Sequence, residues 1–128
     1  MFYITPDEIV LIHDKIVEEI GGSLGVREPG LLEAIAAKPQ ASYGNAELYP
    51  TIYDKAAAIF EALCNYRVFV DGNKRTAIAC LEYFLFKNGF VLKISSVKKE
   101  KFTLQTANSH PDLADVATWI ETHIKKVQ

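Results

Sequence analysis

The sequence has no apolar run approaching the roughly 20 residues that cross a bilayer, so nothing in it predicts a membrane-spanning helix. It has only two cysteines, Cys64 and Cys80, and both fall within apolar helical patterns. They are expected to be small buried hydrophobes, not a disulfide or a metal site. No secretory leader is recognisable, because residues 1–4 run straight into a capped helix. We therefore expect a cytoplasmic protein with no membrane association.

The chain also has little net charge, −2 by formal count, and its pI is near 5.9. This balance argues against direct binding of nucleic acid over a broad surface. Internal repeats, low-complexity segments and interdomain linkers are missing as well. What remains is a chain of 128 residues with 49% hydrophobic and 23% charged residues. These values predict a single folded domain over residues 1–128.

Helical spacing of apolar residues dominates the pattern and predicts an all-α protein. Thr5-Pro6-Asp7-Glu8 is a capping-box start, and Gly21-Gly22 is a stop signal for the helix between them. His13 lies in this first helix, where we expect a structural or solvated role. Further helices are expected at 30–37, 51–66, 73–88, 97–107 and 113–126, with a short strand or extended segment at 90–94. The 73–88 helix is apolar around much of its circumference and should be the buried central helix.

Residues 39–50 lack helical periodicity and contain a Gly-Asn turn signal. We expect a loop or small β-hairpin here. One interpretation is an exposed backbone edge that pairs with another chain by strand addition. The other is a structural connector whose tyrosines plug the core.

The most informative stretch is 67–76, Arg-Val-Phe-Val-Asp-Gly-Asn-Lys-Arg-Thr. Asp71-Gly72 is a turn signal, and the residues after it open a helix. A helix N-terminus has free backbone N–H groups and the positive end of the helix dipole. Adding Lys74 and Arg75 there indicates a phosphate-binding site. The alternative is an ordinary capped helix with solvated basic residues.

This stretch resembles the signature of the Fic/Doc family, His-x-Phe-x-Asp/Glu-Gly-Asn-Gly/Lys-Arg, and most closely its Doc (death-on-curing) toxin branch. The similarity continues on both sides of the signature, over about residues 4–92. It includes Gly25-Val26-Arg27-Glu28, the 39–50 stretch and Lys55-Ala56-Ala57. The resemblance implies a helical bundle around a buried central helix, with a small hairpin or loop flap.

Several site roles follow from the resemblance. Asp71 would hold Mg²⁺ on the phosphates of ATP, and Phe69 would anchor the loop in the core. The phosphate-binding residues would be Gly72, Asn73, Lys74, Arg75 and Thr76. These residues would also offset the negative charge of the transition state. The flap would align the hydroxyl-bearing segment of a protein target by backbone pairing; its residues would be Ala41, Ser42, Tyr43, Gly44, Asn45, Ala46 and Glu47.

Two positions separate the branches of the family. Members that transfer AMP have Gly where this chain has Lys74, and a second Arg where it has Ile78. At both positions this chain resembles the Doc toxin branch. The resemblance implies a bacterial protein kinase that transfers the terminal phosphate of ATP to a Thr or Ser hydroxyl of a protein. The implied target is translation elongation factor Tu, whose modification arrests translation. The alternatives are an AMP-transferase and a non-catalytic module that binds a nucleotide or a partner.

Arg67 departs from the family pattern, because the catalytic His stands at this position. A neutral imidazole accepts the hydroxyl proton, whereas a guanidinium has no acceptor and stays protonated. Tyr66 is a weak substitute for the base because the unperturbed pKa of tyrosine is about 10. His110 is a weak substitute because no sequence motif around it supports a catalytic role. The sequence thus predicts an inactive or impaired catalyst. Two explanations are open: a substitution that disables a lethal toxin, which we favour, and a natural member that has lost catalysis.

Control of the site is expected from outside the chain. The family's internal inhibitory motif, Ser/Thr-x-x-x-Glu-Gly/Asn, is matched in spacing by Ser96 and Glu100, but Lys101 follows where Gly or Asn is required. The resemblance therefore implies a separate Phd-like antitoxin supplied in trans, whose disordered tail folds on binding.

Overall fold

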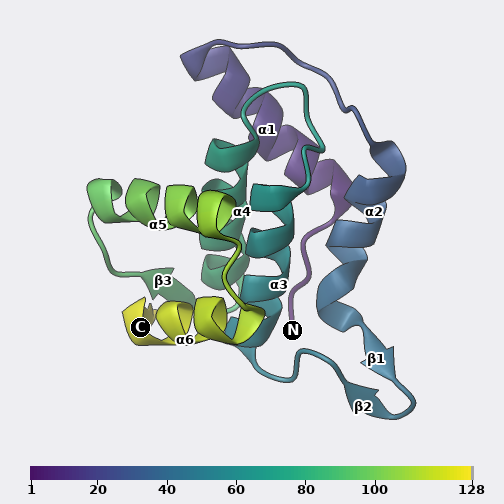
Figure 1. Cartoon of the computed structure of the whole chain (residues 1–128), viewed down its shortest axis with the longest axis vertical. Helices are drawn as coiled ribbons and strands as arrows, with labels where there is room; N and C mark the ends of the chain where they lie inside the picture. Colours follow the sequence, from purple (N-terminus) through teal and green to yellow (C-terminus); the bar gives the residue numbers. More distant parts are fainter. Residues whose placement is uncertain (128) are drawn as a thin grey trace.

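The structure is a computed structural model that describes residues 1–127, within which six α-helices and two small two-stranded β-sheets form (Figure 1). The predicted all-α class is therefore confirmed. The helices are α1 (Pro6–Ile20), α2 (Pro29–Ala37), α3 (Ile52–Asn65), α4 (Asn73–Lys87), α5 (Ser96–Ser109) and α6 (Leu113–His123). One sheet pairs β1 (Ser42–Tyr43) with β2 (Ala46–Glu47), and the other pairs β3 (Phe90–Leu92) with β4 (Ile124–Lys126).

Local signals set the starts of the two helices that frame the fold. The Thr5 hydroxyl accepts the N–H of Glu8, and the Glu8 carboxylate accepts the N–H of Thr5. The same reciprocal pair joins Thr51 and Asp54 at the start of α3. Each capping box satisfies donors that a helix end leaves unpaired. The predicted starts of α1 and α3 are thus confirmed.

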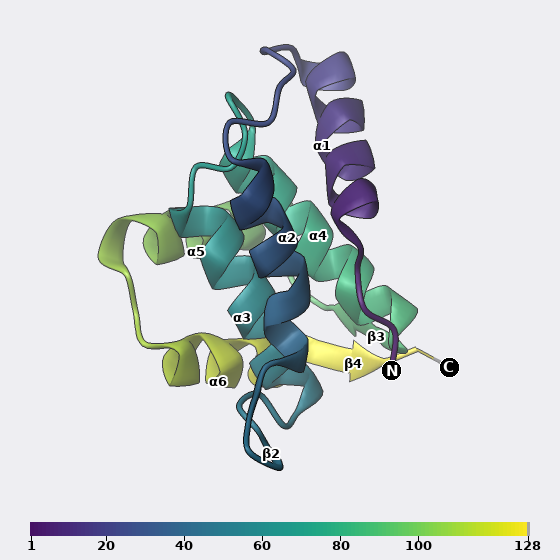
Figure 2. The same ribbon diagram turned by 90° about the vertical axis from the view of Figure 1, so that its right-hand side faces the viewer.

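The core lies mainly between α3 and α4, with α6 and α5 packed on α3 (Figures 1 and 2). The predicted central helix, α4, buries Ala77, Cys80, Leu81, Phe84 and Leu85. α3 is buried over an even longer stretch, from Lys55 to Cys64, and its alanines let its neighbours approach closely. The two helices therefore share the central position, and the loop between them connects the two most extensively buried helices.

One predicted element was wrong at its end. Residues 113–126 were expected to be one helix, but α6 stops at His123 and residues 124–126 form β4. Ile124 pairs with Leu92 and Lys126 with Phe90 in an antiparallel register. Lys125 and Lys126 are exposed on this strand. Pairing with β3 outweighs helix continuation here because it supplies partners for main-chain groups on both segments.

The 39–50 stretch does form a hairpin, after a 3₁₀ turn over Lys38–Gln40. Gly44, with a φ of 62°, begins its two-residue turn. That backbone region favours glycine. Tyr43 is 84% exposed, so the interpretation that the tyrosines of this stretch plug the core is wrong for Tyr43. Within residues 1–127, no helix combines the length and the hydrophobicity needed to cross a membrane.

Candidate phosphate-binding site

The loop between α3 and α4 is closed by the side chain of Asn73, the first residue of α4. Its Oδ1 accepts the N–H of Phe69 at 2.9 Å, and its Nδ2 donates to the carbonyl oxygen of Phe69 at 2.9 Å. Gly72 reverses the chain just before the helix with a φ of 78°, where a side chain would be strained. The loop therefore has a fixed shape before any ligand arrives.

His13 of α1 contacts this loop from the interior of the protein and is completely buried. Its Nε2 lies 2.7 Å from the carbonyl oxygen of Asp71 and donates to it, since a carbonyl can only accept. Its Nδ1 lies 2.9 Å from a carboxylate oxygen of Asp14. The imidazole also stacks on the ring of Phe69, with centroids 3.8 Å apart. His13 thus has the structural role that was one of its two expected roles, and it is not solvated.

A second chain segment, residues 22–28, lies along the loop. Val26 forms a β-bridge with Phe69, and the flanking bonds are Arg27 N–H to Val68 O at 2.7 Å and Val70 N–H to Gly25 O at 3.1 Å. The N–H of Ser23 donates to Oδ2 of Asp71 at 3.0 Å. This last bond orients the Asp71 carboxylate, which is exposed to solvent.

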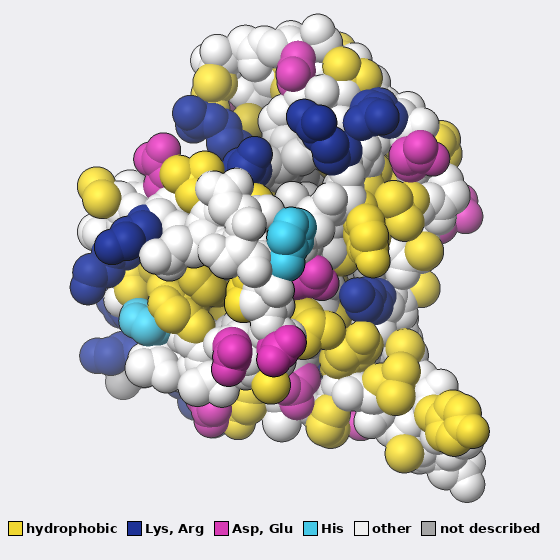
Figure 3. All heavy atoms as spheres, viewed as in Figure 1, with side chains coloured by type: hydrophobic (Ala, Val, Ile, Leu, Met, Phe, Trp, Pro, Cys, Tyr) yellow, Lys and Arg dark blue, Asp and Glu magenta, His cyan; other side chains and the backbone are white. Residues whose placement is uncertain are grey.

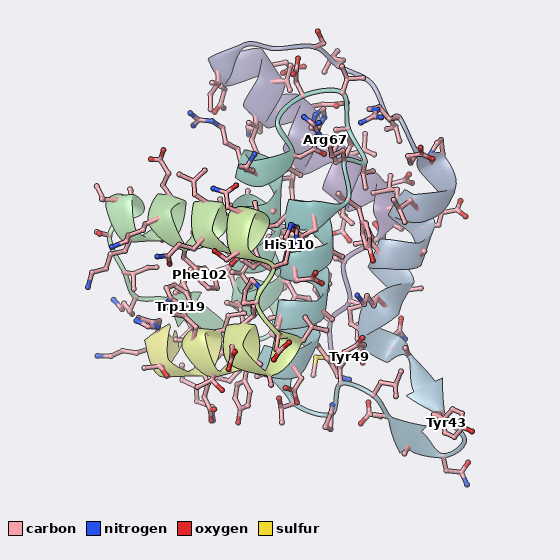
Figure 4. The ribbon with its side chains drawn as sticks, viewed as in Figure 1. Tyr43, Tyr49, Arg67, Phe102, His110 and Trp119 are labelled. Atoms are coloured by element: carbon pink, nitrogen blue, oxygen red, sulfur yellow. The ribbon has the colours of Figure 1, made fainter. Side chains whose placement is uncertain are left out.

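Positive groups gather around the loop without anionic partners. The side chains of Arg27, Arg67, Lys74 and Arg75 are exposed, and within residues 1–127 none of them forms an ion pair. Figure 3 shows basic side chains grouped at the end of the molecule where Figure 4 places Arg67. In addition, the first intrahelical bond of α4 is Thr76 N–H to Gly72 O, and no side chain of the described residues caps the three N–H groups before it. Such a combination favours an anion.

A cavity of about 380 Å³ opens beside the first turn of α4 and continues between α4 and α5. Lys74 and Arg75 border it at one end, and Ile78 and Leu104 contribute apolar surface. An ion pair of 3.2 Å between Lys99 of α5 and Glu82 of α4 joins the two helices along it. The basic end of α4 thus borders a hollow large enough for part of a small organic molecule.

The structure does not bring every predicted site residue to this point. Thr76 is buried, and its Oγ1 has no hydrogen-bond partner in the described chain, so this hydroxyl does not face the basic surface. Both Oδ1 and Nδ2 of Asn73 bond to the main chain of Phe69, so the group of Asn73 that we expect to face a ligand is its main-chain N–H. Phe69, predicted to anchor the loop, is buried at 1% exposure.

The predicted flap is also distant from the loop. The hairpin precedes the first residue of α3 and the loop follows the last, and α3 has 14 residues. At 1.5 Å per residue the helix separates them by about 20 Å. Figure 4 accordingly shows Tyr43 near one end of the molecule and Arg67 near the other.

Few groups at the loop can accept a proton. Arg67 has no acceptor, and Tyr66, which is 45% exposed, is the neighbouring candidate. His110 lies at the C-terminal end of α5, outside the loop between α3 and α4. Burial raises the pKa of the Cys64 and Cys80 thiols to about 12, so neither supplies a thiolate near neutral pH. This agrees with their predicted role as buried hydrophobes.

Comparison with known proteins identifies a family and two relatives that this chain resembles in sequence. A family model described as the Fic/DOC family matches residues 3–85. The chain is 49% identical over 72 residues to Toxin Doc of Mycolicibacterium smegmatis, which is 56% of this chain and 55% of that protein. It is 31% identical over 117 residues to Protein kinase doc of Escherichia phage P1, which is 91% of each chain. The match thus spans about half of the mycobacterial relative and nearly all of the phage one.

Proposed function

The chain belongs to the Fic/Doc family, and on that premise we propose that it is a Doc-like toxin of a toxin–antitoxin system. Its reaction would transfer the terminal phosphate of ATP to a Thr or Ser hydroxyl of a protein, with translation elongation factor Tu as the target. The relatives named Toxin Doc and Protein kinase doc support the toxin role and the protein kinase activity in this proposal. Within the structure, the observation that carries it is the group of cations around the start of α4. Among residues 1–127 these cations have no ion pair, and the helix start has no side-chain cap.

The phosphates would be held by three kinds of group. Lys74 and Arg75 supply positive charge, the main-chain N–H groups of residues 73–75 donate hydrogen bonds, and Gly72 allows the backbone to come close. These donors would also face the charge that develops on the phosphate oxygens during transfer. Because Asn73, His13 and Ser23 already fix the loop, little rearrangement would be needed on binding.

The donor set also fits Mg²⁺. Among residues 1–127 there is no cluster of three or more His, Cys, Asp or Glu residues that would hold a metal by protein ligands alone. Mg²⁺ in nucleotide sites is usually held by one or two carboxylates together with phosphate oxygens. Asp71 provides one exposed carboxylate beside the phosphate site, and Ser23 uses only one of its oxygens. When bound, the ion would offset phosphate charge.

Removal of the hydroxyl proton is the step for which this chain lacks the family's catalytic base. In the transfer, the target oxygen bonds to the terminal phosphorus, the bond to the bridging oxygen breaks, ADP leaves, and the hydroxyl proton must go to a base. Arg67 stands where the family pattern has His, and its guanidinium accepts no proton. We therefore propose that the chain binds Mg-ATP but is inactive or impaired in transfer. Arg67 itself adds to the positive charge that attracts the nucleotide.

Transfer of AMP is the second candidate, and a non-catalytic binding module is the third. Lys74 and Ile78 occupy the positions that distinguish the branches, and both favour phosphate transfer. Ile78 is half-buried against the cavity beside α4, so an arginine there would add charge to a partly apolar wall. The binding module shares the nucleotide site but predicts no gain of activity when Arg67 is replaced by His.

Two protein partners belong to the proposal. The target would contact the β1–β2 hairpin, and because this hairpin lies about 20 Å from the start of α4 along α3, the target surface would have to reach both places. A Phd-like antitoxin in trans would control the toxin in the cytoplasm. Co-purification of a short partner protein, followed by calorimetry, tests the second point.

The direct test is the variant Arg67→His, incubated with elongation factor Tu and ATP labelled on the terminal or on the first phosphate. We expect label from the terminal phosphate only. Label from the first phosphate would indicate AMP transfer, and a folded variant that binds Mg-ATP without transferring either label would favour the binding module.

A further inference from the structure

Lys55, in the first turn of α3, has a buried ammonium group that joins both ends of the hairpin segment. The residue is 2% exposed. Its Nζ donates to the carbonyl oxygen of Pro39 at 3.2 Å, to that of Tyr49 at 2.6 Å and to Oε1 of Glu47 at 2.9 Å. All three of its donors are therefore used. One side chain thus closes the segment from residue 39 to residue 49.

The hairpin that Lys55 holds adds nothing to the hydrophobic core. Residues 42–48 are all exposed, and Tyr43 and Leu48 are 84% and 54% exposed. A two-stranded hairpin of this size is marginally stable by itself in water. A buried lysine is rare and unfavourable unless it is fully paired. The fold therefore uses a buried charge to hold in one orientation a hairpin that packs against almost nothing.

We propose that Lys55 is a positioning residue, which fixes the hairpin relative to α3 so that the protein substrate is held in register with the phosphate site. This inference rests on the proposed function, because the hairpin matters to the reaction only if a protein substrate docks on it. The start of α4 is rigidly connected to the same helix through the loop, so α3 acts as the spacer between the two places. Lys55 sets the angle at the hairpin end of this spacer.

The holding of the hairpin by Lys55, which we call the latch, is tested without an activity assay. The measurement is amide hydrogen exchange in the variant Lys55→Met. Met keeps the apolar stem but removes the three donors. We expect exchange over residues 41–48 to become roughly tenfold faster or more, including the Leu48 N–H that donates to Ala41 O. Exchange over residues 69–76 should stay unchanged. Lys38→Met is the matched control, since Lys38 is a neighbouring half-buried lysine whose one ion pair within residues 1–127 is with Glu61, at 3.9 Å.

Glu47→Gln provides a milder variant in case Lys55→Met does not fold. Glu47 is exposed, so this change cannot disrupt the core, yet it removes the only charged acceptor of Lys55. We expect a smaller increase in exchange, again limited to residues 41–48. Exchange equal to that of the unaltered chain in both variants overturns the latch.

The role in the reaction is tested in the Arg67→His background with elongation factor Tu as substrate. We expect Lys55→Met to raise the KM for the protein about tenfold, with kcat and the KM for ATP nearly unchanged. A loosened hairpin with an unchanged protein KM overturns the positioning role. If Arg67→His alone transfers nothing, the proposed function fails and the assignment to the reaction fails with it, whereas hydrogen exchange still decides whether Lys55 is a latch.

Discussion

The side chain of Asn73 binds the main chain of Phe69 twice, once as acceptor and once as donor, each at 2.9 Å. This pair closes the loop that carries Asp71 and Gly72. An amide that would be assigned to phosphate by its place in the sequence motif thus has a different task. It holds the main-chain donors of the loop in the geometry that a phosphate group needs.

Asn73→Ala should therefore weaken both the fold and the ligand site. Loss of two partly buried hydrogen bonds lowers the free energy of unfolding by about 1–3 kcal/mol, and the freed loop should bind Mg-ATP less tightly. Asn88→Ala is the control, because Asn88 makes the same two-way contact with Phe2 at the opposite end of α4. Denaturant unfolding should show a loss in both variants, and calorimetry a loss of nucleotide binding in Asn73→Ala alone. Equal nucleotide affinity in the two would contradict this role.

Thr76→Val should stabilise the protein. The Oγ1 of Thr76 is buried without a hydrogen-bond partner in the described chain, and an unpaired buried polar group costs about 1–3 kcal/mol. Valine has the same shape and removes that penalty. Thr106→Val is the comparison, since its buried hydroxyl donates to Phe102 O at 2.9 Å and its removal should destabilise. If Thr76→Val instead abolishes Mg-ATP binding in a stable protein, the hydroxyl belongs to the ligand site.

The two cysteines should resist alkylation in the folded protein. With thiol pKa values of about 12, the thiolate fraction at pH 8 is about one in ten thousand. Burial adds a steric barrier. Mass spectrometry after treatment with iodoacetamide should detect both adducts only in denaturant. Rapid labelling of Cys64, which lies at the loop end of α3, would show that this end of the helix opens.

A hydrogen bond between Tyr83 and Glu8 should make stability depend on pH. The Tyr83 hydroxyl donates to Oε2 of Glu8 at 2.6 Å, which lowers the pKa of Glu8 and raises the pKa of Tyr83. A lowered carboxyl pKa stabilises the fold above the unfolded value, 4.5, and this gain is lost as pH falls through the folded pKa. The raised pKa of Tyr83 stabilises the fold below pH 10, the unfolded value, and this stabilisation is lost as pH rises through the folded pKa.

Tyr83→Phe should accordingly unfold at lower denaturant concentration than the unaltered chain between about pH 5 and pH 9. The difference between the two proteins should shrink below pH 4. A difference that stays constant from pH 3 to pH 8 would show that lost packing, and not the charged hydrogen bond, separates them.

Local patterns predicted most of the fold. Thr5 and Thr51 sit within three residues of their capping partners, and Gly44-Asn45 marks its own turn, so neighbouring residues are enough to identify these features. The end of α6 was missed because β4 forms only when β3, more than thirty residues earlier, is in place. Nothing local distinguishes Lys125 on a strand from Lys125 on a helix face.

The candidate site divides in the same way. The cations and the turn are contiguous, so the sequence indicates an anion site at the start of α4. The groups that hold it together are not contiguous: His13 and Asp71 are 58 residues apart, and Lys55 joins two places on either side of the hairpin. No residue spacing reveals such contacts. The distance between hairpin and loop likewise follows only from the length and direction of α3.

The most direct test of the account is a calorimetric titration of the unaltered chain with Mg-ATP. We expect one site, with affinity at least about tenfold lower in the double variant Lys74→Ala/Arg75→Ala. The affinity should be unchanged in the control Lys98→Ala/Lys101→Ala, which removes two exposed lysines from α5. Absence of binding to the folded chain, or equal affinity in all three proteins, would contradict the claim that the start of α4 binds nucleotide phosphates.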